Sequence, residues 1–112
     1  MEFLNKVEIK GIVGNVRSGA VNDNYYVQFN VLTKYVYTNP LGQKIVEGIW
    51  WDCKRWLESR AKEQAVINLK KGDAVHLTGR LRIHKYVEEG FNGFHYDAQS
   101  NEVIVDSLEI LQ

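Results

Sequence analysis

Apolar and polar side chains alternate between Val75 and Tyr86, and this alternation constrains the fold more than any other feature of the chain. Val75, Leu77, Leu81 and Ile83 hold odd positions, whereas the even positions hold polar residues and Tyr86. A period of two places successive side chains on opposite faces of a β-strand. The stretch therefore predicts a strand with one face on a core and the other face open to solvent or to a ligand.

Two earlier segments also read as strands. Residues 3–17 predict a first strand, but their apolar positions change parity near Gly11 and Gly14. Glycine inside a strand often marks a bulge or a bend, and a bent strand serves two parts of a curled sheet. A polar turn separates this strand from residues 25–31, whose odd positions are apolar and whose even positions are mostly polar. These two strands are therefore expected to begin a barrel.

A third strand is predicted for residues 45–56, after a loop over residues 38–44 that holds the only proline. The alternation places Trp50, Lys54 and Trp56 on one face of this strand. Two tryptophans therefore share a face with a lysine.

The remaining segments complete a recognisable order. Apolar residues recur every four positions over residues 57–68, which predicts one amphipathic α-helix. After the strand that starts near Val75, residues 87–101 predict a Gly-rich loop and residues 102–111 a last strand. Three strands, a helix and two strands form the arrangement of the OB-fold. We expect an all-β, five-stranded Greek-key OB-fold barrel with one α-helix between strands 3 and 4, in a single domain over residues 1–112.

The net charge is zero, but the charges are segregated along the chain. Residues 54–85 carry nine basic and three acidic side chains, a net charge of about +6, and the remainder carries about −6. The single cysteine, Cys53, allows no intrachain disulfide and fits a reducing compartment. No secretory signal and no long apolar stretch is visible. We expect a cytoplasmic protein that does not enter a membrane.

Aromatic and basic side chains on the same strand faces suggest a nucleic-acid site. Flat rings stack on bases and cations contact phosphates, so a groove that offers both binds single strands without reading base edges. The competing interpretation is that the aromatic residues pack under loops or against another subunit. Trp51, of opposite parity to Trp50, is assigned to the core or to a subunit interface. The candidate DNA-binding residues are Lys34, Tyr37, Trp50, Lys54, Trp56, Arg80, Arg82, Lys85, Tyr86 and Phe91.

Enzymatic chemistry finds little support in the sequence. His76, His84 and His95 are scattered and, with Cys53, show no metal-ligand spacing. The chain has no phosphate-binding glycine loop and no serine nucleophile motif. Cys53 occupies a core-facing strand position and reads as a small buried hydrophobe. We expect no enzyme, no cofactor, no metal and no catalytic residue.

Two segments and one tryptophan carry a family resemblance. The segments are Leu4-Asn-Lys-Val-Glu-Ile-Lys-Gly-Ile-Val-Gly14 and Leu69-Lys-Lys-Gly-Asp-Ala-Val-His-Leu-Thr-Gly-Arg-Leu-Arg82, and the tryptophan is Trp50 with the aromatic end of its strand. With them the chain resembles the bacterial single-stranded DNA-binding protein family over nearly its whole length. The resemblance implies an OB-fold homo-oligomer, usually a tetramer, that associates with the bacterial nucleoid and coats single strands in replication, recombination and repair.

The resemblance also carries residue roles. Trp50 and Trp56 match stacking aromatics, while Tyr37 and Tyr86 stand where the family often has tryptophan. Arg82 matches a phosphate-contacting position of the family. Lys85 comes directly after a position that is basic in the corresponding segment of the family. Asp52 departs from the family, because a basic residue is common at that position, and this weakens local phosphate attraction.

The resemblance does not extend to the C-terminus, where the family typically has a flexible tail with an acidic, apolar tip that recruits partner enzymes. The chain stops at Gln112, which fits a truncated chain, a tail-less relative or a member of the related primosomal class. The alternative function is accordingly a primosomal-type OB-fold module that binds proteins. Dimer or tetramer, DNA or RNA, and contact with replication proteins stay open.

Overall fold

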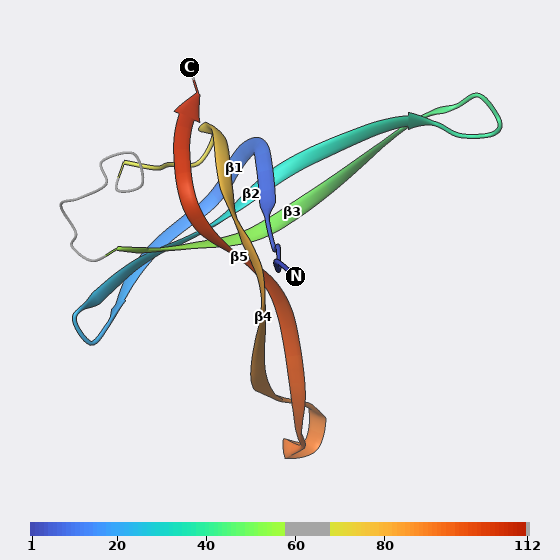
Figure 1. Ribbon diagram of the computed structural model, residues 1–112. Coiled ribbons are helices and arrows are strands. Elements are labelled where there is room, and N and C mark those ends of the chain that lie inside the picture. The colour runs from blue at the N-terminus through green and yellow to red at the C-terminus, as the bar shows by residue number, and fades with distance from the viewer. Residues whose placement is uncertain (58–67, 112) are drawn as a thin grey trace.

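The protein folds into a closed barrel of five long strands (Figure 1). The structure is a computed structural model, and it describes residues 1–57 and 68–111. Around the barrel the strands follow the order β1-β2-β3-β5-β4, and every neighbouring pair is antiparallel except β3 with β5. The strands are β1 (Val7–Val21), β2 (Asn24–Thr38), β3 (Lys44–Leu57), β4 (Ala74–Glu89) and β5 (His95–Leu111).

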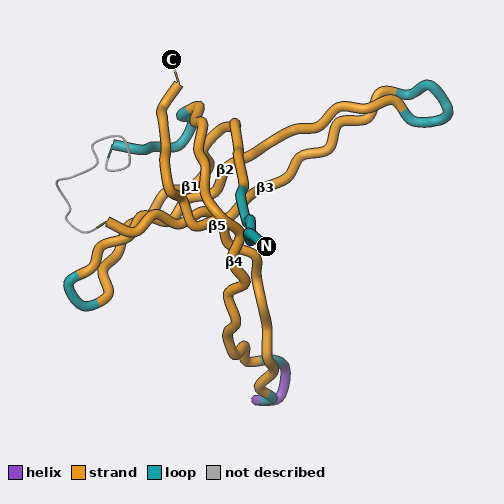
Figure 2. Tube along the Cα trace, viewed as in Figure 1, coloured by secondary structure: helices purple, strands orange, loops and turns teal. Residues whose placement is uncertain are grey.

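Three hairpins extend beyond the barrel in different directions, with short loops at their tips (Figures 1 and 2). β1 and β2 pair as far as Val21 with Asn24, β2 and β3 as far as Thr38 with Lys44, and β4 and β5 as far as Glu89 with His95. Each strand therefore contributes one part to the barrel wall and another to a projecting two-stranded arm.

The hydrophobic core follows the alternation seen in the sequence. On β2 the side chains of Val27, Phe29 and Val31 are buried, and on β4 those of Val75 and Leu77. One face of each strand thus fills the barrel, which confirms the predicted inward parity of these segments. The other buried core side chains are Ile9, Val13, Cys53, Leu57, Leu69, Val103, Ile104 and Val105.

The predicted bend in the first strand is confirmed. The pairing of β1 with β2 shifts register between Val13 and Val16, so the strand bulges beside Gly14. The predicted bounds were wrong, because the strand begins at Val7 and continues to Val21. Before Val7, the side chain of Asn5 extends the pairing. Its amide donates to the Leu81 carbonyl at 2.8 Å, and its oxygen accepts from the Leu81 N–H at 3.0 Å.

The loop predicted over residues 87–101 is largely a hairpin. β4 runs to Glu89, a short 3-10 turn (η1, Phe91–Gly93) reverses the chain, and β5 starts at His95. The glycines and acidic residues of this segment predicted a loop. In the structure β4 and β5 pair along the arm, and this pairing satisfies the backbone hydrogen-bonding groups of both strands. Leu81 and Ile83, predicted to face the core, are exposed instead, because they lie on this arm beyond the register shift at Gly79.

The predicted fold class needs a correction at the α-helix. The described residues contain no α-helix, and their only helical turn is η1, so the fold they define is an all-β barrel. Leu57, the first residue of the predicted helix, is instead the last residue of β3, where its buried side chain continues the core face. Residues 58–67, which make up most of the predicted helix, lie outside the described residues.

Candidate nucleic-acid interface

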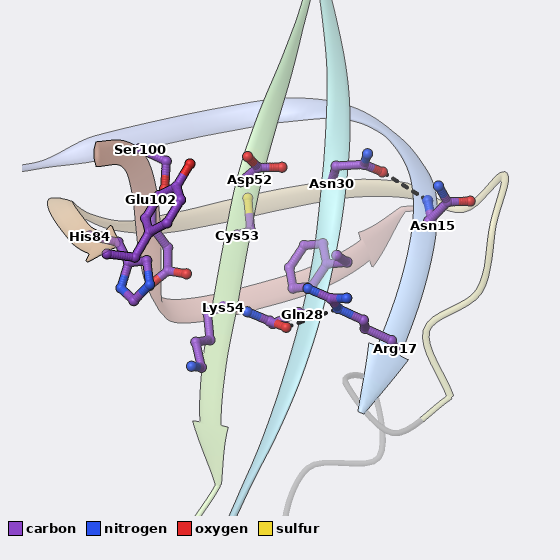
Figure 3. Close-up of a pocket in the computed structure, with 12 residues that line it drawn as sticks. Asn15, Arg17, Gln28, Asn30, Asp52, Cys53, Lys54, His84, Ser100 and Glu102 are labelled. Atoms are coloured by element: carbon purple, nitrogen blue, oxygen red, sulfur yellow. Dashed lines mark hydrogen bonds between the residues drawn. The ribbon is translucent and has the colours of Figure 1, made fainter. Parts of the chain in front are cut away.

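A groove of about 790 Å³ crosses the outer face of the barrel (Figure 3). All five strands contribute to it, so residues far apart in the sequence meet there. Asn15 and Arg17 from β1 lie on one side in the close-up, and His84, Ser100 and Glu102 from the β4–β5 arm lie on the other. The remaining lining residues are Gln28, Phe29, Asn30, Asp52, Cys53, Lys54 and Tyr86.

The floor of the groove is the outward face of β2 and β3. Gln28 pairs with Lys54 across the two strands, and Asn30 pairs with Asp52. The same alternation places Trp50 and Trp56 on this face, one at each end of the polar stretch. The sequence placed the two tryptophans and the lysine on one face, and the observed register is consistent with that placement.

Trp56 belongs to a compact aromatic and cationic cluster with Tyr26 and Lys54. The two rings meet edge to face with centroids 5.4 Å apart, and Tyr26 is the direct cross-strand partner of Trp56. The Lys54 Nζ lies 4.4 Å from both ring centroids, within the range of a cation–π contact. Trp56 remains 38% exposed. The cluster therefore offers ring surface and a positive charge at one place.

Trp50 forms the second aromatic surface, near the bulge of β1. Its side chain is 54% exposed, and its ring lies over Gly14, where an added Cβ would come within 2.6 Å of the ring. The missing side chain of Gly14 thus leaves room for the Trp50 ring. Trp50 and Trp56 are six residues apart on one strand face, which separates them by about 20 Å. Several nucleotides fit between them.

Two hydrogen bonds hold the β1 side of the groove. The Asn15 backbone N–H donates to Asn30 Oδ1 at 2.8 Å, and the Arg17 Nε donates to Gln28 Oε1 at 2.9 Å. Asn15, Arg17 and Tyr26 were not among the residues predicted from the sequence. Tyr26 shares the even parity of Gln28 and Asn30 on β2, so this signal was available.

The β4–β5 arm supplies the opposite side. Tyr86, a predicted site residue, lines the groove with its ring stacked on His84 at a centroid distance of 5.7 Å and an angle of 22°. Ser100 and Glu102 from β5 lie beside them. His84 was not among the predicted site residues, and its place in the groove follows from having the same parity as Tyr86.

The other basic residues predicted on β4 do not line the groove. Arg80 forms an ion pair with Asp106 at 3.7 Å. Arg82 lies opposite Glu102 in the register of β4 and β5. Lys85 follows His84, so it lies on the opposite face of the arm. The cations that line the groove are instead Arg17 and Lys54.

Three predicted residues lie out on the arms. Lys34 is exposed on β2 opposite Gly48, on the same face as Trp50. Tyr37 has the opposite parity, stacks on Tyr35 at 6.0 Å, and donates its hydroxyl to Glu47 Oε1 at 3.2 Å. That hydrogen bond and the Glu47 charge raise the pKa of the Tyr37 hydroxyl. Phe91 lies at the tip of the β4–β5 arm and is 94% exposed.

Cys53 lies beneath the groove and is a poor nucleophile. Its side chain is buried, and burial, with smaller effects from the Asp52 and Glu102 charges, raises the pKa of its thiol to about 12. Only the thiolate reacts readily, so the native protein should resist a thiol reagent at neutral pH. We expect labelling to be slow in the native state and complete in denaturant, as followed by absorbance of the released chromophore. Equally fast labelling in both states would contradict this burial.

The described residues include neither a metal-binding cluster nor a membrane-spanning helix. No group of three or more His, Cys, Asp or Glu side chains is arranged to hold a metal ion there. No helix among residues 1–57 and 68–111 is long and apolar enough to cross a membrane.

Five strands closed into a barrel, with aromatic rings and cations along a groove over β2 and β3, define a barrel of the oligonucleotide-binding type. The model of the single-strand binding protein family matches residues 4–111. The chain therefore belongs to the single-strand binding protein family, and it binds single-stranded DNA.

Solved structures agree with this assignment at the level of the fold. A Plasmodium falciparum single-strand binding protein in complex with single-stranded DNA is 19% identical with a TM-score of 0.77, over 100% of this chain and 98% of that one. A deletion mutant and the wild type of the Thermus aquaticus single-stranded DNA-binding protein are each 17% identical over 97% of this chain, with TM-scores of 0.76 and 0.73. The match covers 51% and 50% of those two chains. No curated protein sequence matches significantly.

Proposed function

We propose that the chain coats single-stranded DNA with little regard to sequence, with the strand running along the groove between the β1–β3 face and the β4–β5 arm. The observation that carries this proposal is the line of side chains on one face of β3, where Trp50 and Trp56 flank Asp52 and Lys54. Bases stack on the two tryptophans and Tyr26, while Arg17 and Lys54 contact phosphates. Such contacts reach every base through its ring face, which accounts for sequence tolerance.

Coating of this kind serves replication, recombination and repair, and we assign the chain to these processes without an enzymatic activity of its own. We also propose a cytoplasmic homo-oligomer, for which the family resemblance favours a tetramer and leaves a dimer open. Its support is the exposed apolar face of β4, where Leu81, Ile83 and Val87 are 38%, 53% and 65% exposed. Apolar side chains gathered on one strand face favour association. Contacts with replication proteins remain part of the same proposal.

Titration with single-stranded DNA, followed by tryptophan fluorescence, tests the proposed function. Stacking on Trp50 or Trp56 should quench the emission, whereas Trp51, half-buried with its indole N–H donating to Thr33 Oγ1 at 2.8 Å, should contribute a constant background. A thymine homopolymer of a few tens of nucleotides should quench strongly and a matched duplex should not. No response to either nucleic acid would contradict the proposal.

The salt dependence of binding should report the role of Lys54. Each phosphate contact on a single strand releases a counterion and adds about −0.7 to the slope of log affinity against log salt concentration. Lys54→Gln should therefore make the slope shallower by about 0.7. The matched control is Lys10→Gln, because Lys10 is exposed on β1 outside the groove. An unchanged slope for Lys54→Gln would remove Lys54 from the phosphate contacts.

A further inference from the structure

Two glycines of β1 lie beneath aromatic side chains of the groove face. A Cβ added at Gly14 would come within 2.6 Å of the Trp50 ring. A Cβ added at Gly19 would meet the Tyr26 hydroxyl and lie 2.6 Å from the ring carbon that carries it. Gly19 is the cross-strand partner of Tyr26, and Tyr26 is in turn the partner of Trp56. The aromatic surfaces at both ends of the groove therefore lie where β1 carries no side chain.

The atoms that an added methyl group would meet distinguish these two glycines from Gly11 and Gly79. At Gly11 and Gly79 the nearest atom is a backbone carbonyl oxygen, which can move only with its strand. At Gly14 and Gly19 the three nearest atoms all belong to side chains. Neither of these two positions has a positive φ, so the backbone conformation does not require glycine there. Alanine at Gly14 or Gly19 would therefore move the rings and leave the barrel closed.

The bulge of β1 holds a further group at the Trp50 end of the groove. Next to Gly14, where the register shifts, the Asn15 N–H donates to Asn30 Oδ1 at 2.8 Å (Figure 3). The same oxygen is the nearest atom to a Cβ added at Gly14. The Asn30 amide and the Trp50 ring therefore share the space above Gly14, and the hydrogen bond to Asn15 fixes the amide there.

The Tyr26 end is equally dependent on the place of one ring. Tyr26 meets Trp56 edge to face with centroids 5.4 Å apart, and Lys54 Nζ lies 4.4 Å from both centroids. A Cβ at Gly19 would displace the Tyr26 ring and so disturb its contacts with both neighbours. Because a base stacks on the face of a ring, a displaced ring loses stacking even though the aromatic residue is still present.

We propose that Gly14 and Gly19 are positioning residues for DNA binding, which act by leaving the space in which Trp50 and Tyr26 hold their stacking positions. This inference rests on the proposed stacking of bases on these rings. Alanine at either glycine should weaken the binding of single-stranded DNA by about fivefold, which corresponds to the lower end of the range for one stacked base.

A double-mutant cycle at each end of the groove tests whether the glycine acts through its ring. Gly14→Ala is measured alone and together with Trp50→Ala, and Gly19→Ala is measured alone and together with Tyr26→Ala. The affinity for a labelled thymine homopolymer is followed by fluorescence anisotropy at fixed salt. Each glycine substitution should cost about fivefold when the ring is present and less than about twofold when the ring is absent, because the two substitutions then remove the same interaction.

The matched control is Gly48→Ala, which adds the same methyl group to β3 on the face that carries Trp50. The added Cβ meets only Leu32 Cδ1 at 3.4 Å, so no ring moves and the affinity should stay at the wild-type value. Circular dichroism and thermal unfolding of every variant show whether the barrel is still folded.

Three outcomes would overturn the positioning role of a glycine and leave the proposed function standing. They are wild-type affinity of its alanine variant, an equal loss with and without the ring, and an alanine variant that does not fold, which would assign the glycine to folding. A different outcome would overturn the proposed stacking and the positioning role with it, namely wild-type affinity when Trp50→Ala and Tyr26→Ala are each measured alone.

Discussion

Replacing Trp50 and Trp56 together with alanine should weaken binding of single-stranded DNA by about thirtyfold or more. Each stacked base contributes about 1 to 3 kcal/mol, so the loss of two stacking surfaces costs at least about 2 kcal/mol of binding free energy. Both rings are partly exposed, at 54% and 38%, so their removal leaves the core side chains in place. The measurement is affinity by fluorescence anisotropy of a labelled strand, because the variant loses its own fluorescence signal.

Tyr25→Ala is the matched control for the Trp56 half of this variant. Tyr25 is 39% exposed, close to the exposure of Trp56, and it lies on the opposite face of β2 from Tyr26. It should leave the affinity within about twofold, a free-energy change of under ~0.5 kcal/mol. Circular dichroism and thermal unfolding should show that each variant remains folded. A folded double variant with wild-type affinity would place the DNA elsewhere on the protein.

The sequence predicted the strand faces better than the strand lengths. Alternation identified the buried side chains of β2 and the shared face of Trp50, Lys54 and Trp56, because a period of two depends only on local backbone geometry. The β2–β3 arm agrees with the loop predicted over residues 38–44. The β4–β5 arm was missed because its strands carry acidic and small polar residues and are joined through glycines, so burial leaves no pattern there. Pairing between β4 and β5, a long-range property, extends these strands to Glu89 and His95.

The composition of the groove was harder to predict than its aromatic ends. Asn15, Arg17, Ser100 and Glu102 come from strands that meet only in the closed barrel, and a single sequence does not reveal that meeting. Strand parity alone also selected cations that do not line the groove. The alternating face of β4 suggested Arg80 as a phosphate contact, whereas the structure pairs it with Asp106. The groove was therefore predicted where it lies on β3 and missed where it depends on how β1, β4 and β5 meet.

Gly79→Ala should strongly destabilise the barrel. Gly79 is buried where β4 and β5 shift register, and an added Cβ would meet the Ile104 carbonyl oxygen, lie 2.9 Å from the Ile104 carbonyl carbon and lie 3.1 Å from the Val105 Cα. All three atoms belong to the backbone, so the two strands must separate. Overpacking costs about 1 to 3 kcal/mol where side chains can adjust, and we expect about 3 kcal/mol or more here.

Gly48→Ala shows whether this cost arises from the close approach and not from the loss of a glycine. An added Cβ at Gly48 meets only Leu32 Cδ1 at 3.4 Å, an ordinary van der Waals contact, and the position has no positive φ. Alanine there should change the free energy of unfolding by under ~1 kcal/mol, because it also restricts the unfolded chain. In thermal unfolding Gly79→Ala should lower the Tm by more than about 10 °C, since 1 kcal/mol corresponds to about 4 °C or more in a domain of this size. Similar melting of the two variants would mean that β4 and β5 do not approach each other so closely at Gly79, and that the arm carrying His84 and Tyr86 into the groove is held by other contacts.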